Sequence, residues 1–341
     1  MVKLERNGLA AAVRWLNGYQ IGRPDWLILE TTNRCNQKCP ICGAGNGTYA
    51  MPKGFLPRGW FADLATAAFE LRPAAVCLHA RGEPLLHPHI TELIGALHAK
   101  GLQTHMATNG LLLTSDLARG LRNAGLDQLV VSHPGISAEN YRACRGADQP
   151  PHYETGLMKA LQAWEGSGRD VIIRCLTLPA ALSDGPQAMS GFLAKWLGHA
   201  AVQRVEFTAY QPWPQHVCED LLPGIHSRPR ICDMTFDRLA MLWDGTLTPC
   251  SNDIRGELAI GRWPQISLHR AFNCPEVRRV RRAHMHRSTR RNALCRRCLL
   301  PRAASPLAFA SRRELSGRRD AQLEKWFRHK GRLMWRFFDP R

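Results

Sequence analysis

Three cysteines lie close together near the start of the chain, at Cys35, Cys39 and Cys42. They follow the apolar run 26–30, so the spacing C-x3-C-x2-C places three thiols on one loop directly after an expected strand. Three thiolates alone do not complete a tetrahedral zinc site. They can hold three irons of a [4Fe–4S] cube and leave the fourth iron open to a ligand from outside the protein. An open iron is reactive, so this loop is predicted to be a catalytic centre.

Four more cysteines form a second group in the C-terminal part of the chain, namely Cys232, Cys250, Cys295 and Cys298. The sequence Asp244-Gly245 predicts a hairpin turn between the apolar runs 239–243 and 246–248, which would bring the first two cysteines together. Four thiols in two pairs can enclose either a zinc ion or a [4Fe–4S] cluster. Cys274 lies between the pairs and is a spare candidate ligand. The cysteines expected to pack in the interior are Cys77, Cys144, Cys175 and Cys218.

The composition is typical of a globular protein with a strong positive charge. Hydrophobic residues make up 45% and charged residues 22% of the chain. No apolar run reaches the roughly 18 residues that a membrane span needs, and the N-terminus lacks a secretory apolar core. We therefore expect a cytoplasmic protein without membrane contact, whose 12 cysteines are reduced. The formal charge of +18 favours an acidic partner, although a general preference for arginine explains it equally well.

Strands and helices alternate between residues 26 and 208. The expected strands are 26–30, 75–79, 103–108, 128–132, 171–176 and 202–208. The expected helices are 58–71, 88–100, segments beginning near Ser115 and Ser137, 154–166 and 187–199. This alternation is typical of parallel βαβ units, and six strands fit a partial (β/α)6 TIM-like barrel with its functional loops after the strands. An open flavodoxin-like sheet fits the periodicity equally well, and the cysteine loop favours the barrel.

Changes in composition divide the chain into four segments. These are an N-terminal helical extension, 1–25, with an amphipathic helix at 5–17; a barrel domain, 26–215; a small α+β domain, 216–305; and a basic helical tail, 306–341. The proline-rich stretch at 211–215 marks the second boundary, because the βα rhythm stops beyond it. The tail is expected to pack against the rest of the protein, with contact to a partner as the alternative.

The first cysteine loop resembles the defining motif of the radical S-adenosylmethionine (SAM) superfamily. Cys35, Cys39 and Cys42 match that motif position by position, while Ile41 stands where the family more often has an aromatic residue. The resemblance implies a [4Fe–4S] cluster whose open iron binds SAM, and an electron donor such as flavodoxin or ferredoxin. It also implies reductive cleavage of SAM and abstraction of a hydrogen atom by the resulting 5′-deoxyadenosyl radical.

The same resemblance assigns SAM contacts to the ends of the next strands. In the family, a motif like Gly82-Glu83-Pro84 lies near the methionine ammonium group, and the end of the third strand contacts the ribose or carboxylate. A polar residue ending the fourth strand, and an arginine on the following helix, meet the same cofactor. The predicted SAM-binding residues are therefore Gly82, Glu83, Pro84, Thr108, Asn109, Ser132 and Arg145. Ordinary turn and capping chemistry is the alternative.

Four residues near the ends of later strands are candidates for substrate contact or proton transfer. His133 ends the fourth strand and is either a substrate contact or a satisfied structural histidine. Arg174 lies within the fifth strand, where an anionic cofactor or substrate would offset the cost of burying its charge. Glu206 and Tyr210 flank the end of the sixth strand and face either substrate or a neighbouring helix.

The C-terminal cysteines resemble the SPASM/Twitch domain of radical SAM enzymes, including Asn252, Asp253 and Gly261 after the second cysteine. A full SPASM domain carries further cysteines after the C-x2-C pair, and none follow Cys298 here. The resemblance therefore implies the shorter Twitch form with one auxiliary [4Fe–4S] cluster. A structural zinc ion is the alternative.

An auxiliary cluster beside a substrate radical favours net oxidation, so we expect a dehydrogenase-like radical SAM oxidoreductase, with a rearrangement of the substrate as the alternative reaction. Only 34 residues precede Cys35, which leaves no room for the leader-recognition domain of many peptide-modifying relatives. A small polar substrate is therefore expected, such as a sugar, an aminocyclitol or a nucleotide derivative, and the excess of arginine is compatible with an anionic one. Alternatives are a peptide maturase with a separate leader-binding protein, and an RNA-modifying enzyme that grips RNA through the basic stretch 278–297. A zinc-dependent interaction protein would leave the three-cysteine loop unexplained.

Overall fold

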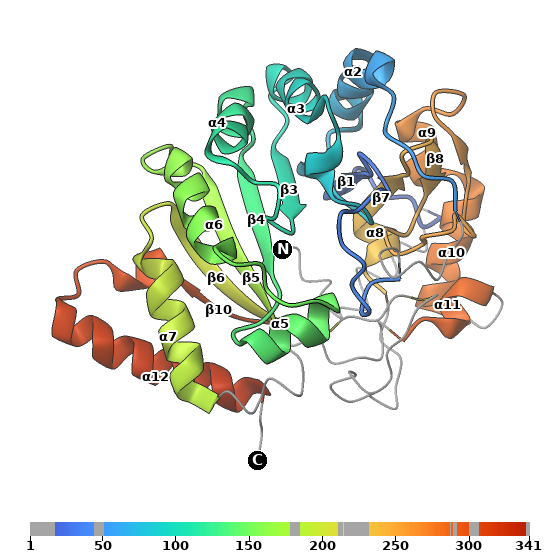
Figure 1. Cartoon of the computed structure of the whole chain (residues 1–341). Coiled ribbons are helices and arrows are strands. Elements are labelled where there is room, and N and C mark those ends of the chain that lie inside the picture. The colour runs from blue at the N-terminus through green and yellow to red at the C-terminus, as the bar shows by residue number, and fades with distance from the viewer. Residues whose placement is uncertain are drawn as a thin grey trace.

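The computed structural model describes residues 18–43, 51–177, 185–210, 214, 232–286, 288, 292–299 and 307–338. The helix expected at 5–17, Cys218 and most of the boundary stretch 211–215 lie outside the described residues. The described strands form one ten-stranded sheet in the order β10-β6-β5-β4-β3-β2-β1-β7-β8-β9. Figure 1 shows this sheet as an open arc with helices along its outer side.

Six parallel strands form the first part of the sheet, as predicted. They are β1 (Trp26–Leu29), β2 (Ala75–Cys77), β3 (Thr104–Thr108), β4 (Gln128–His133), β5 (Asp170–Thr177) and β6 (Val202–Ala209). Each pairs in parallel with the next. Because parallel strands carry their following loops to one edge, the cysteine loop and the turns after β2, β3 and β4 meet there. The expectation of a partial TIM-like barrel is confirmed.

Helices cover the outer face of these strands and bury a continuous apolar core. They are α2 (Phe61–Leu71), α3 (Ile90–Ala99), α4 (Ser115–Ala124), α6 (Tyr153–Leu161) and α7 (Gly185–Gly198). The helix α5 (Ala138–Arg145) lies instead at the lower ends of the strands in Figure 1. Short 3-10 turns are η1 (Arg58–Trp60), η2 (Pro84–Leu86) and η3 (Gln162–Trp164). In α3 the buried residues recur with the helical period, at Ile90, Leu93, Ile94 and Leu97. In the part of the chain described, no helix is long and apolar enough to cross a lipid bilayer.

The region after the barrel extends the same sheet. It comprises α8 (Met234–Asp237), β7 (Arg238–Met241), β8 (Thr246–Thr248), β9 (Gly261–Arg262), α9 (Leu268–Asn273), α10 (Pro275–Met285) and α11 (Ala293–Arg297). β7 and β8 form the predicted antiparallel hairpin around Asp244-Gly245. β7 also pairs in parallel with β1, so the hairpin is joined by hydrogen bonds to the strand that leads into the cysteine loop.

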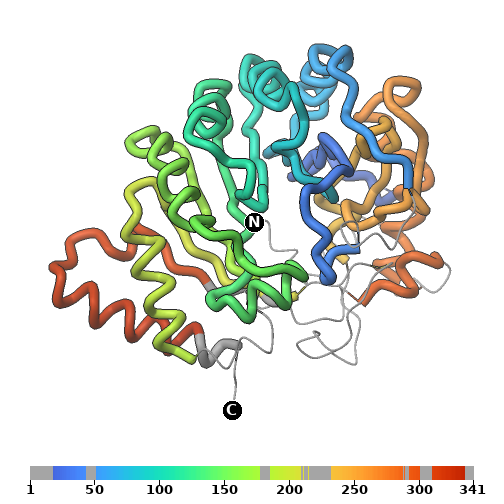
Figure 2. The backbone as a smooth tube through the Cα atoms, in the orientation of Figure 1, coloured from blue at the N-terminus to red at the C-terminus, as the bar shows by residue number. Residues whose placement is uncertain are grey.

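The C-terminal tail contains a strand that the expectation of an all-helical tail missed. β10 (Leu307–Ser311) pairs antiparallel with β6 and covers the edge that β6 would otherwise expose. The turn η7 (Arg312–Leu315) and the helix α12 (Asp320–Phe338) follow. α12 packs closely on α7, since a Cβ atom at Gly331 would lie 2.2 Å from Oγ of Ser190. Figure 2 shows the tail at the α7 end of the arc, opposite the α9–α11 region.

Candidate active site

The first cysteine loop begins directly after β1 and is crowded by the neighbouring turns. The main-chain N–H of Cys42 donates a 3.0 Å hydrogen bond to the carbonyl of Cys39, which closes the second half of the loop. Burial raises the pKa of Cys35 to about 11, and the nearby Glu83, Cys39 and Cys42 add to this increase. Cys39 is buried, Cys42 is half-buried and Cys35 is exposed, so the three thiols lie on one loop that opens to solvent at Cys35. A cationic metal group bound there would stabilise the thiolates.

The motif Gly82-Glu83-Pro84 packs against the backbone that leads into this loop. A Cβ atom at Gly82 would lie 2.3 Å from the carbonyl oxygen of Thr32 and 2.5 Å from that of Arg34. The N–H of Glu83 donates a 2.8 Å hydrogen bond to the same Arg34 carbonyl. Glycine is therefore required by the close approach of the two backbones. Pro84 is buried and begins the turn η2.

The carboxylate of Glu83 joins the ends of two strands. It accepts hydrogen bonds from the Thr108 hydroxyl at 2.7 Å, the Asn109 N–H at 2.8 Å and the Leu85 N–H at 3.1 Å. Burial raises the pKa of Glu83, and these three hydrogen bonds oppose that shift. Because its carboxylate oxygens accept hydrogen bonds from the protein itself, Glu83 holds the neighbouring loops in position.

Asn109 links the end of β3 to the cysteine loop. Its Nδ2 donates a 2.7 Å hydrogen bond to Oδ1 of Asn36, which follows Cys35. Its carbonyl accepts a 2.9 Å hydrogen bond from the hydroxyl of Tyr153. The structure therefore brings Glu83, Thr108 and Asn109 together at the cysteine loop.

Arg145 reaches the same loop from the end of α5. Its Nη1 lies 3.5 Å from Sγ of Cys39, and its Nη2 donates a 2.6 Å hydrogen bond to the carbonyl of Ser132. The following Gly146 packs on Pro40, with its Cβ position 3.0 Å from Cδ of the proline. The Nε atom of Arg145 is buried and has no hydrogen-bond partner among the described residues. A buried cationic donor beside three thiols suits a group that carries negative charge.

Two of the predicted catalytic residues form an ion pair across neighbouring strands. Nε of Arg174 lies 2.9 Å from Oε2 of Glu206, and the two residues stand opposite each other in the β5–β6 register. The neighbours of Arg174 along β5, Ile173 and Cys175, are fully buried in the core under the helices. Since side chains alternate along a strand, Arg174 and Glu206 face the barrel interior. Tyr210 is also buried, and it packs with Ile41 of the cysteine loop.

His133 points away from this interior. Its Nδ1 contacts the carbonyl of Gly135 at 2.7 Å, and its Nε2 contacts Oε1 of Glu154 at 3.1 Å. Its ring packs edge-on against Phe192 and Trp196 of α7. These contacts are those of the satisfied structural histidine, the alternative that the sequence left open. They do not support the other alternative, a substrate contact or proton acceptor at His133, because the pleat of β4 turns this position toward the helices.

Two histidines that sequence reasoning missed lie on the interior side. Nδ1 of His79 accepts a 3.1 Å hydrogen bond from the Ala107 N–H. Burial lowers the pKa of His79 to about 4, and the nearby Arg174 and His105 contribute to this decrease. His105 packs edge-on against Trp26, with ring centroids 5.2 Å apart. The available signal was the position of His79 at the end of the second expected strand.

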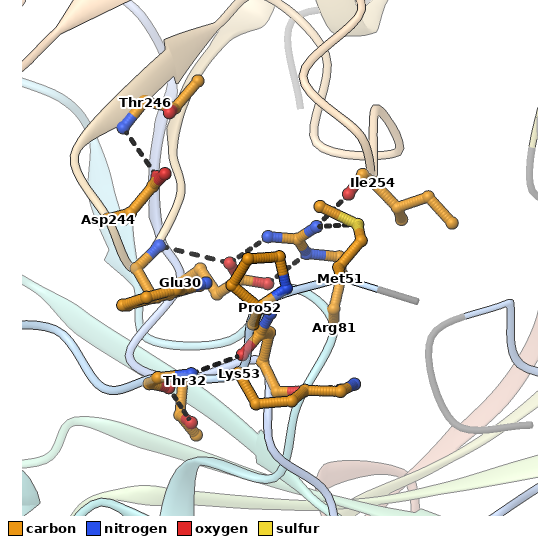
Figure 3. Close-up of polar contacts among 12 residues, drawn as sticks. Glu30, Thr32, Met51, Pro52, Lys53, Arg81, Asp244, Thr246 and Ile254 are labelled. Atoms are coloured by element: carbon orange, nitrogen blue, oxygen red, sulfur yellow. Dashed lines mark hydrogen bonds and ion pairs between the residues drawn. The ribbon is translucent and has the colours of Figure 1, made fainter. Parts of the chain in front are cut away.

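A buried ion pair ties the barrel to the C-terminal region. Arg81 and Glu30 face each other in Figure 3, and both side chains are almost fully buried. Glu30 also accepts a 3.2 Å hydrogen bond from the N–H of Trp243, at the β7–β8 turn. Arg81 also donates to the carbonyl of Ile254. The pair therefore connects the β7–β8 hairpin to the end of β1, which leads into the cysteine loop, and to the turn after β2, which packs against that loop.

The four C-terminal cysteines line one small cavity. Its lining includes Cys232, Cys250, Cys295 and Cys298, together with Thr235, Asn252 and His284. Burial raises the pKa of Cys250 and raises that of Cys295 to about 12, with Cys232 and Cys298 adding to both shifts. Cys274 is not among the residues that line this cavity, and it occupies the N-cap position of α10.

Asp253 shapes the loop that follows Cys250. Its buried carboxylate accepts hydrogen bonds from the Thr248 hydroxyl at 3.0 Å and the Leu258 N–H at 2.8 Å. Within the described ranges, no three His, Cys, Asp or Glu side chains stand close enough to hold a single metal ion. A cavity surrounded by four thiols is compatible with a cluster, in which several irons separate the ligand sulfurs.

The chain matches two family models. The radical SAM superfamily model matches residues 29–179, and the SPASM iron–sulfur cluster-binding domain matches residues 232–299. Among solved structures, BtrN in complex with AdoMet and 2-DOIA has a TM-score of 0.55 at 14% identity, covering 80% of this chain and 92% of that one. SuiB of Streptococcus suis bound to S-adenosylmethionine has a TM-score of 0.59 at 12% identity, covering 80% and 71%. These likenesses concern the fold.

A curated relative matches part of the chain in sequence. It is a 7,8-dihydro-6-hydroxymethylpterin dimethyltransferase of Methanocaldococcus jannaschii, 30% identical over 162 residues, which are 46% of this chain. The chain matches only 30% of the length of that relative. The matched family models, the parallel barrel and the two cysteine groups agree with one another. The chain therefore carries a radical SAM domain at residues 29–179, which implies a SAM-binding [4Fe–4S] cluster, and a SPASM domain at residues 232–299, which implies auxiliary iron–sulfur chemistry.

Proposed function

We propose that this protein is a radical SAM oxidoreductase that removes hydrogen from a small polar substrate bearing an anionic group. In this proposal Cys35, Cys39 and Cys42 hold the SAM-binding cluster. The four cysteines of the C-terminal cavity hold one auxiliary cluster. When bound there, the first cluster would supply the electron for reductive cleavage of SAM, the chemistry that makes abstraction of a hydrogen atom from the substrate possible.

The residues around the cysteine loop suit the binding of SAM. Arg145 offers a cation beside Cys39, where the carboxylate of SAM would be stabilised. Glu83 and Asn109 hold the strand ends and the cysteine loop in a fixed arrangement. Gly82 and Pro84 keep the backbone of that turn against the loop, and Thr108 and Ser132 complete the surrounding strand ends.

The Arg174–Glu206 pair is the observation that carries the substrate proposal. Arg174 is 40% exposed on its side chain and Glu206 is 6% exposed, so the cation is accessible while the carboxylate is enclosed. An anionic substrate group can therefore approach Arg174 from the barrel interior. Glu206 and the partly buried His79 are then the polar groups available to bind hydroxyl or amino groups of the substrate. Tyr210 packs with Ile41 of the cysteine loop.

A substrate screen tests this proposal. The anaerobically reconstituted chain is incubated with SAM, a reductant and a panel of phosphorylated sugars, aminocyclitols, nucleotides and short peptides. We expect 5′-deoxyadenosine to form in step with a small-molecule product that has lost two hydrogens, measured by mass spectrometry. Turnover of only peptides, or a product that gains a methyl group, would contradict the proposal.

A variant comparison tests the role of the cation. Replacing Arg174→Gln should raise KM for an anionic substrate about tenfold more than for its neutral analogue, the loss of one charged hydrogen bond. Arg119→Gln is the matched control, because that arginine pairs with Asp116 on an exposed face of α4. Equal effects on both substrates would assign Arg174 a structural role instead.

A further inference from the structure

Two buried polar side chains face the four-cysteine cavity without a partner. Nε2 of His284 and Oγ1 of Thr235 have no hydrogen-bond partner among the described residues, and both residues line the cavity. Their exposed fractions are 5% and 2%. A buried donor left without a partner costs about 1–3 kcal/mol, so two of them around one cavity indicate a group that accepts hydrogen bonds there.

The surrounding structure holds both side chains in place. Thr235 lies in α8, and its carbonyl accepts a 2.7 Å hydrogen bond from Nε of Arg281. Arg281 is fully buried in α10, the helix that also carries His284, and it donates to the carbonyl of Phe272 at 2.8 Å. The two helices are thereby fixed to each other beside the thiols. The unpartnered atoms are therefore part of a rigid wall.

We propose that His284 and Thr235 donate hydrogen bonds from Nε2 and Oγ1 to the sulfur atoms of the auxiliary cluster and so raise its reduction potential. This inference rests on the proposed placement of that cluster at Cys232, Cys250, Cys295 and Cys298. Hydrogen bonds to the sulfurs of a cluster stabilise its reduced, more negative state. A higher potential makes the cluster a better acceptor for the electron that leaves the substrate during net oxidation.

A redox titration followed by electron paramagnetic resonance tests the inference. The full chain carries Cys35→Ala, Cys39→Ala and Cys42→Ala, so that the auxiliary cluster alone gives the signal. We expect His284→Leu to shift the equilibrium for reduction about tenfold toward the oxidised cluster, equal to about 59 mV for one electron. Thr235→Val should shift it in the same direction. His284→Gln keeps an N–H donor and should restore much of the potential.

Met234→Leu is the matched control, because it changes an apolar residue of the same lining at nearly constant volume. Unchanged potentials in His284→Leu and Thr235→Val would overturn the inference, as would an equal shift in His284→Gln and His284→Leu. If His284→Leu fails to retain iron, Thr235→Val decides alone, and an unchanged potential there overturns the inference. An unmodified chain with only about four irons would contradict the placement of the auxiliary cluster itself.

Discussion

The hydroxyl of Thr108 donates a 2.7 Å hydrogen bond to the carboxylate of Glu83, 25 residues earlier in the chain. This bond connects the turn after β2 to the end of β3. Glu83 also accepts from the Asn109 N–H, and Asn109 in turn reaches Asn36 in the cysteine loop. A single buried carboxylate therefore connects the motifs that surround the three thiols. Removing it should disturb the arrangement of all of these motifs.

Replacing Glu83→Gln should lower the free energy of unfolding by about 1–3 kcal/mol. The amide keeps one acceptor oxygen and turns an NH2 group toward donors, so a buried N–H loses its partner. Urea unfolding at neutral pH measures the change. Glu92→Gln makes the same substitution in an exposed pair with Arg58 and should leave the stability almost unchanged, because water screens that pair. Equal losses in the two variants would contradict the role given to Glu83.

Replacing Arg145→Ala should weaken SAM binding about tenfold or more, because a charge-assisted hydrogen bond is lost beside Cys39. The change in the paramagnetic resonance spectrum of the reduced cluster on adding SAM gives the dissociation constant. Arg142→Ala is the control, since Arg142 lies one turn earlier on α5 and pairs with exposed Asp148. If both variants bind SAM alike, the carboxylate of SAM lies elsewhere.

The two groups of cysteines should each account for about four irons per chain after anaerobic reconstitution. Cys295→Ala should therefore reduce the iron content from about eight to about four per chain and abolish net oxidation, while SAM cleavage continues. Cys274→Ala should retain all the iron, because Cys274 lies outside the four-cysteine cavity. Iron and sulfide analysis measures both. Loss of iron in Cys274→Ala would place that thiol among the ligands.

His79 should make the stability of the protein depend on pH. Its folded pKa is lowered to about 4 from 6.5 by burial and by nearby cations. Below about pH 6.5 this histidine binds a proton in the unfolded chain but stays neutral in the folded chain. Its contribution to the free energy of unfolding is therefore fully present above pH 6.5 and is lost as the pH falls toward 4. From pH 7.5 to pH 5.5 the protonation of this group in the unfolded chain should lower the free energy of unfolding by about 1 kcal/mol.

His79→Asn should abolish this contribution, since the amide oxygen can accept the Ala107 N–H in place of Nδ1. Urea unfolding of the wild type and the variant at the two pH values measures it. His329→Asn, on the exposed side of α12, should keep the pH dependence of the wild type. A variant at His79 that keeps the full slope would show that another group titrates in this range.

The radical SAM resemblance, the cofactors that it implies and the six parallel strands were all predictable from the sequence. The spacing of Cys35, Cys39 and Cys42 indicates the cluster that they can bind. The strands are predictable from the local periodicity of apolar residues, which a short window of sequence contains. The β7–β8 hairpin was predictable for the same reason, since Asp244-Gly245 specifies its own turn. The strand β10 was missed because its place depends on the free edge of β6, about a hundred residues earlier.

The contacts between polar side chains could not be predicted from the sequence and became known from the packing of the folded chain. His133 turned toward α7 because its position on the pleat of β4 faces the helices, whereas Arg174 and Glu206 meet because the β5–β6 register sets them opposite each other. The burial of Glu30 against Arg81, and of His284 beside the four cysteines, depends on segments far apart in the chain. Residue type and spacing reveal what chemistry a chain can perform. The direction and partner of each side chain depend on packing between distant elements, which local sequence does not encode.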